Sequence, residues 1–305
     1  MQHVAAERPS AVIVANQHAG GGRGARIARE SRVALENAGI STTLVQPASL
    51  AAMKAALGEA CADPDTFLIA CGGDGTVHQV LQAAMASSMR MGIIPAGTGN
   101  DIARALGIDV KARSAWLRIM AERMLANEAT LVDVTQISLG EEQVWSLGVV
   151  STGFDSAVNE RADRMTRLRG TARYVAALLG ELRTFALHDY QVTIDEDRYA
   201  GSALLIAIGN GSSYGGGMLI CPHADMADGL LDVTWVAAAP RRTVLRFFPR
   251  IFRGTHVDHP LVTTYRAREI TVAADGAIVY ADGERIGPPP VHVRVRAGAL
   301  RILRP

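Results

Sequence analysis

The chain has 305 residues, of which 49% are hydrophobic and 20% are charged, and its formal net charge is +1. This composition indicates a globular protein of one large or two ordinary domains and excludes a disordered chain. A net charge so close to zero gives no general electrostatic reason to expect a nucleic-acid partner. The three cysteines, Cys61, Cys71 and Cys221, lack the spacing of a metal or redox motif, so we expect reduced thiols and a cytoplasmic location.

No uninterrupted apolar stretch reaches the ~20 residues that a membrane-spanning helix needs. The N-terminus places Glu7 and Pro9 before a short apolar run, which is not the pattern of a signal peptide. We therefore expect any contact with a membrane to be peripheral, at its inner face. The sequence does not set the oligomeric state, and a homodimer stays open.

The first predicted elements are a buried strand at residues 11–15, a glycine-rich turn, and a helix over residues 25–38. Asn16 follows the strand, and Gly20 opens the glycine cluster. Glycines let the backbone pass close to a ligand, and the free N–H groups at a helix start favour an anion. The turn is therefore a candidate phosphate site, and the alternative is a flexible turn without a ligand.

A second strand is predicted at residues 41–45 and its helix at residues 48–60. The third strand, at residues 66–70, leads into the turn Gly72-Gly73-Asp74-Gly75-Thr76 and a following helix. The same reasoning predicts a phosphate site at this turn. Asp74 is unusual there, because a carboxylate repels phosphate unless a cation bridges the two groups or the side chain holds a loop.

A fourth strand, at residues 91–94, ends in another turn of this kind, Gly97-Thr98-Gly99-Asn100-Asp101, with Asn100 or Asp101 near a helix cap. Two phosphate-type loops on successive strands are more specific than one. Strands that alternate with helices, including a further helix at residues 111–127, predict a parallel sheet covered on both faces. Ligands of such sheets lie beyond the carboxyl ends of the strands, where all three glycine turns are expected.

Beyond residue 132, short β-branched runs separated by turns predict a mostly antiparallel β-sandwich or barrel. We therefore expect an α/β domain at residues 1–132 and a β-rich domain at residues 133–305, with its last strand a candidate to return to the first domain. Helical insertions are predicted at residues 156–187 and 241–254, and Pro249 is expected to interrupt the second. The strands are expected at residues 144–150, 190–194, 203–208, 231–236, 269–272, 277–280 and 291–295.

Three segments of this half carry candidate chemistry. Asp225 and Asp228 lie in a loop whose carboxylate and carbonyl oxygens suit Mg²⁺ or Ca²⁺, although a plain turn is the alternative. Asp282-Gly283-Glu284 places two carboxylates around a glycine just after a predicted strand. Residues 241–253 mix arginines with aromatic residues, which indicates either an interfacial segment that meets anionic lipid or a solvated face.

Together these motifs resemble the diacylglycerol kinase catalytic domain family, which includes soluble bacterial lipid kinases and the sphingosine and ceramide kinases. The resemblance rests on residues 72–76, 95–101, 153–155, 228–233 and 282–284, and so covers nearly the whole chain. It implies an N-terminal parallel sheet like that of NAD kinase and phosphofructokinase, followed by an antiparallel β-sandwich. It also implies ATP-dependent transfer of phosphate to a hydroxyl of diacylglycerol or a related lipid at the membrane surface.

The resemblance assigns roles to individual residues. Mg²⁺ would bridge the ATP phosphates to Asp74, with Asp101 nearby, and Glu284, with Asp282, would activate the lipid hydroxyl. The nucleotide-binding residues implied are Asn16, Gly20, Gly72, Gly73, Asp74, Gly75, Thr76, Gly97, Thr98, Asn100 and Asp101.

The resemblance further implies a structural Mg²⁺, remote from phosphate transfer, in the loop at residues 221–230. Its ligands would be the carboxylate of Asp228 and the carbonyls of Asp225 and Leu230. The wall of the lipid cleft would include Gly153-Phe154-Asp155, the region around Tyr174 and the glycine-rich loop at residues 209–217.

Two alternatives to a lipid kinase stay open. A Gly-Gly-Asp-Gly loop also occurs in NAD kinases and phosphofructokinases, so a kinase for a soluble substrate is the first. The second is a regulator that binds nucleotide or lipid without turnover, because four positions depart from the family pattern. These are Gln17, Ala19, Gln46 and Gln79, in place of proline, serine, threonine and glutamate.

Overall fold

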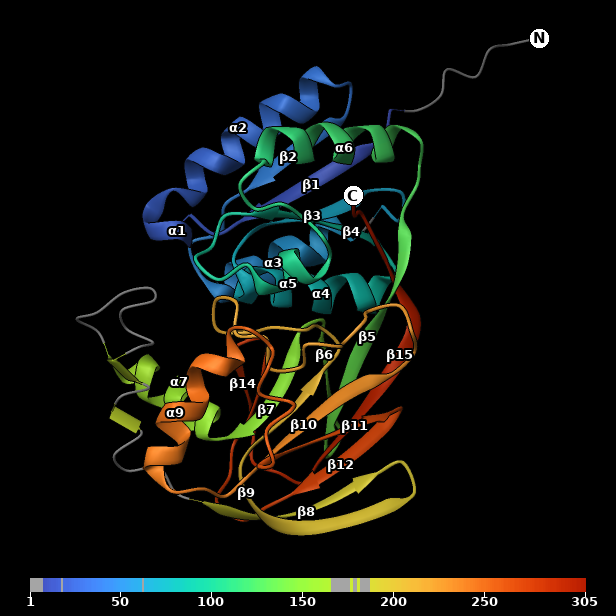
Figure 1. Cartoon of the computed structure of the whole chain (residues 1–305). Helices are drawn as coiled ribbons and strands as arrows, with labels where there is room; N and C mark the ends of the chain where they lie inside the picture. Colours follow the sequence, from blue (N-terminus) through green and yellow to red (C-terminus); the bar gives the residue numbers. More distant parts are fainter. Residues whose placement is uncertain (1–7, 18, 62, 166–175, 178–179, 182–186) are drawn as a thin grey trace. The chain divides into compact units, whose positions relative to one another are not determined.

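The structure is a computed structural model that describes residues 8–17, 19–61, 63–165, 176–177, 180–181 and 187–305 (Figure 1). The chain divides into two compact units. Unit 1 comprises Met1–Val132 and Ala299–Pro305, and unit 2 comprises Asp133–Gly298.

Unit 1 is built on four parallel strands, β1 (Ser10–Ala15), β2 (Ser41–Val45), β3 (Phe67–Gly72) and β4 (Arg90–Pro95). Their order in the sheet is β2-β1-β3-β4. β3 is buried along its whole length, as expected for a central strand with helices on both faces. The end of β15 (Val291–Ile302) also joins this sheet, because Ile302 pairs in parallel with Met91.

Helices cover both faces of the sheet of unit 1 (Figure 1). α2 (Gly24–Asn37) and α6 (Arg113–Leu125) lie on one face, and α3 (Leu50–Ala60) and α4 (Asp74–Ser87) lie on the other. Two short helices, α1 (Ala19–Gly22) and α5 (Asp101–Ala105), follow the ends of β1 and β4. The predicted parallel α/β fold is confirmed, because each apolar run is a parallel strand close to its expected bounds.

Unit 2 is mostly antiparallel and is organised around β9 (Asp197–Gly209). This strand pairs in antiparallel register with β7 (Val149–Gly153), β8 (His188–Ile194) and β10 (Leu231–Ala237). The pairing confirms the predicted antiparallel class. The remaining strands are β5 (Thr130–Leu139), β6 (Glu142–Ser146), β11 (Val262–Ala267), β12 (Glu269–Ala273), β13 (Val279–Ala281) and β14 (Glu284–Gly287).

Two hydrophobic clusters occupy the opposite faces of β9. Ile206 and Ile208 point into a cluster formed between strands, whereas Leu205 and Ala207 point into a second cluster. This alternation follows from the two-residue repeat of a strand. The second cluster is covered by two helices, α7 (Phe154–Arg164) and α9 (Arg241–Ile251).

Several expectations for unit 2 need correction. The run at residues 144–150 is two strands, because β6 ends at Ser146 and β7 begins at Val149. β11 was not predicted, because Thr263 and Thr264 are exposed and polar and the strand therefore lacks an alternation of apolar and polar residues. β14, with four residues, is too short for a periodic pattern.

The two predicted helical insertions also differ from the structure. α7 ends at Arg164, and most of the rest of the first insertion, including Tyr174, lies outside the described residues. Pro249 lies inside α9 and does not interrupt it. A proline lacks the N–H that would bond the carbonyl of Leu245, but α9 ends at Ile251, so only its last turn is affected.

Asp133 ties distant parts of unit 2 together. Its side chain is 3% exposed, and its two carboxylate oxygens accept hydrogen bonds from the amides of Gly298 (2.8 Å) and Gly229 (2.6 Å). Its backbone carbonyl accepts a further bond from the side-chain amide of Asn210 at 2.9 Å. One buried carboxylate therefore joins the start of unit 2 to its last strand and to the loop before β10.

We predict that Asp133→Ala lowers the free energy of unfolding by about 3 kcal/mol, because two amides lose their acceptor in a buried site. Urea denaturation of the purified variant measures the change. Asp197→Ala, which removes an exposed carboxylate of β9, serves as the control and should change stability by less than about 0.5 kcal/mol. Equal effects of the two substitutions would contradict this role of Asp133.

Candidate active site

The three glycine turns of unit 1 lie together at the carboxyl edge of the sheet, because they follow neighbouring parallel strands. The amide of Asn16 donates a hydrogen bond to the carbonyl of Cys71 at 3.2 Å, which joins the first turn to the second. The carbonyl of Gly72 accepts hydrogen bonds from the amides of Ala96 (2.9 Å) and Gly97 (3.1 Å), which joins the second turn to the third. The structure thus confirms the predicted convergence.

Close backbone contacts explain why glycine is required in these turns. A Cβ atom on Gly97 would lie 2.4 Å from the Cα of Gly73, and a Cβ atom on Gly20 would lie 2.4 Å from the carbonyl oxygen of Ala96. Gly20 also has a φ of +58°, which disfavours other residues. The floor of this edge is therefore bare backbone beside the N-terminus of α4, a setting that suits phosphate oxygens.

Asp74 begins α4 and reaches the third turn. One of its carboxylate oxygens accepts a hydrogen bond from the amide of Ile102 at 3.1 Å. The sequence left two roles open for this carboxylate, and the structure shows that it does hold a loop. Holding a loop and attracting a cation are compatible roles, because a carboxylate keeps its negative charge when it accepts a hydrogen bond.

Asn100 and Asp101 shape the third turn from within. Asn100 has a φ of 54° at the start of α5, and its side chain bonds both the amide (2.9 Å) and the carbonyl (3.0 Å) of Gly97. Asp101 is 5% exposed and forms an ion pair with Arg104 at 2.6 Å. Thr98, between these groups, is exposed at the edge. Asn100 therefore closes the turn instead of capping the helix with its side chain.

Gln46 follows β2, which pairs in parallel with β1, so it lies at the same edge of the sheet. Its side-chain nitrogen is buried and has no hydrogen-bond partner among the residues that the structure describes. A buried donor without an acceptor costs free energy, on the order of 1 to 3 kcal/mol. An acceptor atom of a bound ligand would satisfy the Gln46 nitrogen. Glutamine in place of the threonine that is usual in the family therefore still fits a nucleotide site.

The acidic hairpin of unit 2 places its two carboxylates in different surroundings. Asp282 and Gly283 both have positive φ values, 53° and 84°, which define a tight two-residue turn between β13 and β14. The Asp282 carboxylate accepts hydrogen bonds from the Ser146 hydroxyl (2.8 Å) and the Gly148 amide (2.8 Å). Glu284 begins β14 and is partly exposed. Asp282 therefore anchors the turn, and Glu284 is the better candidate for a base.

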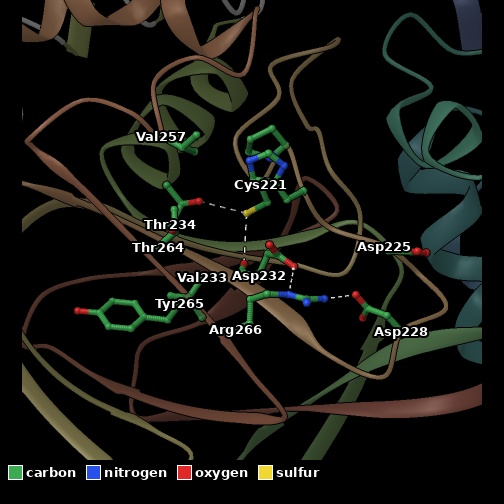
Figure 2. Close-up of a pocket in the computed structure, with 12 residues that line it drawn as sticks. Cys221, Asp225, Asp228, Asp232, Val233, Thr234, Val257, Thr264, Tyr265 and Arg266 are labelled. Carbon is green, nitrogen blue, oxygen red and sulfur yellow. Dashed lines mark hydrogen bonds and ion pairs between the residues drawn. The ribbon is translucent and has the colours of Figure 1, made fainter.

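The loop that was expected to hold Mg²⁺ lines an open cavity of about 470 Å³ in unit 2 (Figure 2). One oxygen of Asp228 accepts a hydrogen bond from the Leu230 amide at 2.9 Å, and the other forms an ion pair with Arg266. Arg266 also lies 3.5 Å from a carboxylate oxygen of Asp232. Burial raises the pKa of Asp232, and the guanidinium of Arg266 opposes that rise.

The cation site expected in this loop would use one carboxylate, that of Asp228, and the backbone carbonyls of Asp225 and Leu230. The carboxylates of Asp225 and Asp228 point in different directions in Figure 2, so they do not form a paired site. Within the described part of the chain, no three side chains of histidine, cysteine, aspartate or glutamate gather in a cluster that could hold a metal ion by side chains alone. A cation here would have to compete with Arg266 for Asp228, and the Mg²⁺ expected in this loop stays a prediction.

A narrow apolar cavity lies between β9, α7 and α9 in unit 2, and Asp155 is the acidic residue among the described residues that line it. Burial raises the pKa of the Asp155 carboxyl to about 6, against hydrogen bonds from Ser151 and Ser156. Gly153 permits this turn, because a Cβ there would lie 2.6 Å from the carbonyl oxygen of Leu204. The other lining residues are Phe154, Leu204, Leu205, Tyr214, Met218, Val244, Phe247, Phe248 and Ile251.

Sequence reasoning missed three features of these sites. Arg266 lies 38 residues after Asp228, and no local pattern links the two. The anchoring role of Asp133 is equally invisible, since its partners come from remote loops. The inward face of α9 was detectable from the spacing of Val244, Phe247 and Ile251, but not the cavity that it lines.

A cradle of backbone turns on a parallel α/β unit, with a β unit that presents an acidic hairpin, defines a nucleotide-dependent phosphotransferase. Residues 10–137 match the diacylglycerol kinase catalytic domain, and residues 148–304 match the YegS C-terminal NAD kinase beta sandwich-like domain. The chain therefore belongs to the diacylglycerol kinase catalytic domain family, as its motifs suggested.

Relatives agree with this assignment. The chain is 40% identical over 250 residues to a diacylglycerol kinase of Mycobacterium tuberculosis, covering 82% of this chain and 80% of that protein. It is 31% identical to a Pseudomonas aeruginosa protein named "Probable lipid kinase YegS-like", covering 81% and 79%. A crystal structure of a Bacillus anthracis diacylglycerol kinase has the same fold, with a TM-score of 0.71, 18% identity and coverage of 98% and 97%.

The described part of the chain contains no helix that is both long enough and apolar enough to cross a membrane.

We predict that replacing Arg266 exposes any latent cation site in the loop. In Arg266→Met, the Asp228 carboxylate loses its competing partner, so Mg²⁺ should stabilise this variant more than the unmodified protein. At a tenfold excess of Mg²⁺ over its Kd the gain is about 1.4 kcal/mol, measured as a rise in unfolding temperature without nucleotide.

Arg268→Met is the matched control, because Arg268 is also exposed and lies two residues away. It should respond to Mg²⁺ as the unmodified protein does. The loop would be ruled out as a cation site if Arg266→Met and Arg268→Met gained the same stability from Mg²⁺.

Proposed function

We propose that this lipid kinase transfers the γ-phosphate of ATP to the free hydroxyl of diacylglycerol. The observation that carries the proposal is the backbone cradle formed by the three glycine turns, with Gly73 and Gly97 in contact. Membership of the diacylglycerol kinase catalytic domain family supports the use of ATP. The choice of diacylglycerol among lipids is supported by the name of the M. tuberculosis relative.

Phosphoryl transfer depends mainly on positioning and on stabilising charge. In our proposal the second and third turns bind the phosphates through backbone N–H groups, with Thr76 and Thr98 beside them. Asn16 and Gly20 would bind from the first turn, and Gln46 would donate its unpaired N–H to the nucleotide.

Asp74, with Asp101 nearby, would hold the Mg²⁺ that neutralises phosphate charge during transfer. Asp74 suits a role in holding Mg²⁺ because it is the first residue of α4 and lies next to turns whose glycines have no side chains. Its hydrogen bond to Ile102 fixes one oxygen toward the third turn. Asp101, which forms an ion pair with Arg104, would add a second carboxylate at the same edge.

The acceptor hydroxyl needs a base, and we assign that role to Glu284. Asp282 would position it by fixing the hairpin, because both Asp282 oxygens accept hydrogen bonds from the connection between β6 and β7. An alcohol is a weak nucleophile, so removal of its proton in or near the transition state accelerates attack.

We place the lipid against the apolar lining around Asp155. The cavity there has a volume of about 20 Å³, which is room for about one water molecule. An acyl chain would therefore enter only if the aliphatic and aromatic side chains of the lining move apart, and the Asp155 carboxyl would then meet a polar group of the headgroup region. The glycine-rich loop contributes Tyr214 to this wall.

A phosphate-transfer assay tests the proposal. The purified protein is incubated with radiolabelled ATP and either diacylglycerol, sphingosine or NAD, and mass analysis identifies the product. Phosphorylated diacylglycerol as the main product is expected. Preferential phosphorylation of NAD would favour a soluble-substrate kinase, and ATP binding without any product would favour a regulator; either result would overturn the proposal.

We predict that Asp74→Asn lowers kcat at least about 100-fold while the unfolding temperature stays unchanged. The asparagine oxygen can still accept the hydrogen bond from Ile102, so the loop is held, but the charge that binds the cation is lost. Asp74→Ala should abolish transfer as well. Asp109→Asn, in an exposed turn, is the control, and comparable activity of Asp74→Asn and Asp109→Asn would refute the role of Asp74.

We predict that Glu284→Gln and Asp282→Asn fail in different ways. Glu284→Gln should lower kcat by about 100- to 10,000-fold, because a general base is lost, and should leave ATP binding intact. Asp282→Asn should instead lower the unfolding temperature, because an amide cannot accept every hydrogen bond that the carboxylate accepts from Ser146, Leu147 and Gly148. Kinetics and thermal unfolding of both variants check this, and loss of stability in Glu284→Gln alone would reverse the assignment.

A further inference from the structure

α9 has an inner face that is fixed by the core of unit 2. Val244, Phe247 and Ile251 are each 4% exposed and belong to the cluster that also contains Leu204 and Leu205 of β9. Their spacing of three and four residues places them on one side of the helix. The opposite side of α9 is therefore the side turned away from this core.

The outer side carries two lines of side chains with different chemistry. One line is formed by Leu245 and Phe252, and the ring of Phe252 meets edge to face, with centroids 5.6 Å apart, the ring of Phe248, which is partly buried and packs against the core. Leu245 is 52% exposed and Phe252 is 49% exposed. Beside them, Arg242, Arg246 and Arg250 follow at intervals of four residues, and Arg241 and Arg253 flank the helix ends.

The arginines of this surface have no acidic partner among the described residues. Residues 240–254 contain five arginines and no acidic residue. All five arginines are exposed, and among the described residues none of them forms an ion pair. The whole chain has a net charge of only +1, so the concentration of charge here is local. A partner of the opposite charge would complement it.

We propose that α9 and the two residues after it dock the protein on an anionic lipid bilayer. The arginines would contact the headgroups, while Leu245 and Phe252 would enter the interface between headgroups and acyl chains. A soluble polyanion would satisfy the arginines alone, but it would leave these apolar side chains in water. This inference rests on the proposed function, because a lipid kinase has to reach a substrate that lies in a bilayer.

The same helix connects this surface to the apolar cavity of unit 2. Val244, Phe247 and Ile251 line that cavity from the inner side of α9, together with Phe248. Docking through the outer side would therefore bring the cavity wall against the membrane that contains the lipid.

Vesicle sedimentation without ATP tests the proposal. The full chain is mixed with vesicles of phosphatidylcholine alone or with about one third phosphatidylglycerol. We expect binding only to the anionic vesicles, weakened by high salt. The triple variant Arg242→Gln, Arg246→Gln, Arg250→Gln should bind on the order of 100-fold more weakly, because each basic residue at the surface contributes about a fivefold factor. Leu245→Gln with Phe252→Gln should remove the part of binding that resists salt.

The matched control is Arg29→Gln, Arg198→Gln, Arg301→Gln, which removes the same charge from exposed arginines of α2, β9 and β15. It should bind anionic vesicles as the unmodified protein does. Phosphorylation of diacylglycerol in detergent micelles, where no bilayer is required, reports that each variant is folded and should be unchanged.

Equal vesicle binding by the two triple variants would overturn the docking role, as would equal binding to both kinds of vesicle or binding to heparin without binding to vesicles. Activity in micelles without vesicle binding would support the proposed kinase function and refute only the docking role of α9. Arginine-dependent vesicle binding without any kinase activity would support the docking role and refute the proposed kinase function.

Discussion

The candidate active site depends on one contact in which two backbone segments touch without a side chain between them. A Cβ on Gly97 would fall 2.4 Å from the Cα of Gly73, so only glycine allows the turns after β3 and β4 to close on each other. The Gly72 carbonyl then accepts two amide hydrogen bonds from the neighbouring turn, at 2.9 and 3.1 Å. This contact fixes the position of the backbone that would bind phosphate oxygens. It also places Asp74 where its carboxylate accepts a hydrogen bond from the next loop.

Unit 2 shows how hydrogen bonds distinguish carboxylates that look alike in the sequence. Asp133 and Asp282 each accept several hydrogen bonds from amides of remote segments, and such saturation suits a structural anchor. Asp228 is held by the Leu230 amide and by Arg266. Asp282, at the turn before the short strand that Glu284 begins, bonds the Ser146 hydroxyl as well. The sequence Asp-Gly-Glu alone does not show that Asp282 bonds this remote segment.

The sequence predicted the parallel sheet well because its physical signals are local. β1, β3 and β4 each contain a short apolar run, and β3 and β4 end at a glycine and a proline that mark the turns after them. The convergence of the three turns followed from the rule that parallel strands end at the same edge. Unit 2 was harder, since β11 and β14 lack an apolar repeat and the pairing of Asp228 with Arg266 spans 38 residues. In the sequence, Gln46 was notable only because it differs from the family pattern. The burial of its side-chain nitrogen could be known only from the structure.

The two sides of α9 are subject to different constraints, which bears on why its outer side has this composition. Packing requires Val244, Phe247 and Ile251 to be apolar, but it places no demand on the residues that face away. Arginines four residues apart repel each other by about 0.2 to 0.5 kcal/mol per pair, and about half of the surface of Leu245 and Phe252 stays exposed to water. Folding alone would be served better by acids alternating with these arginines. This surface is unfavourable for the isolated protein. It becomes favourable against an anionic lipid bilayer, because the negatively charged headgroups attract the arginines and the acyl chains beneath them receive the apolar side chains.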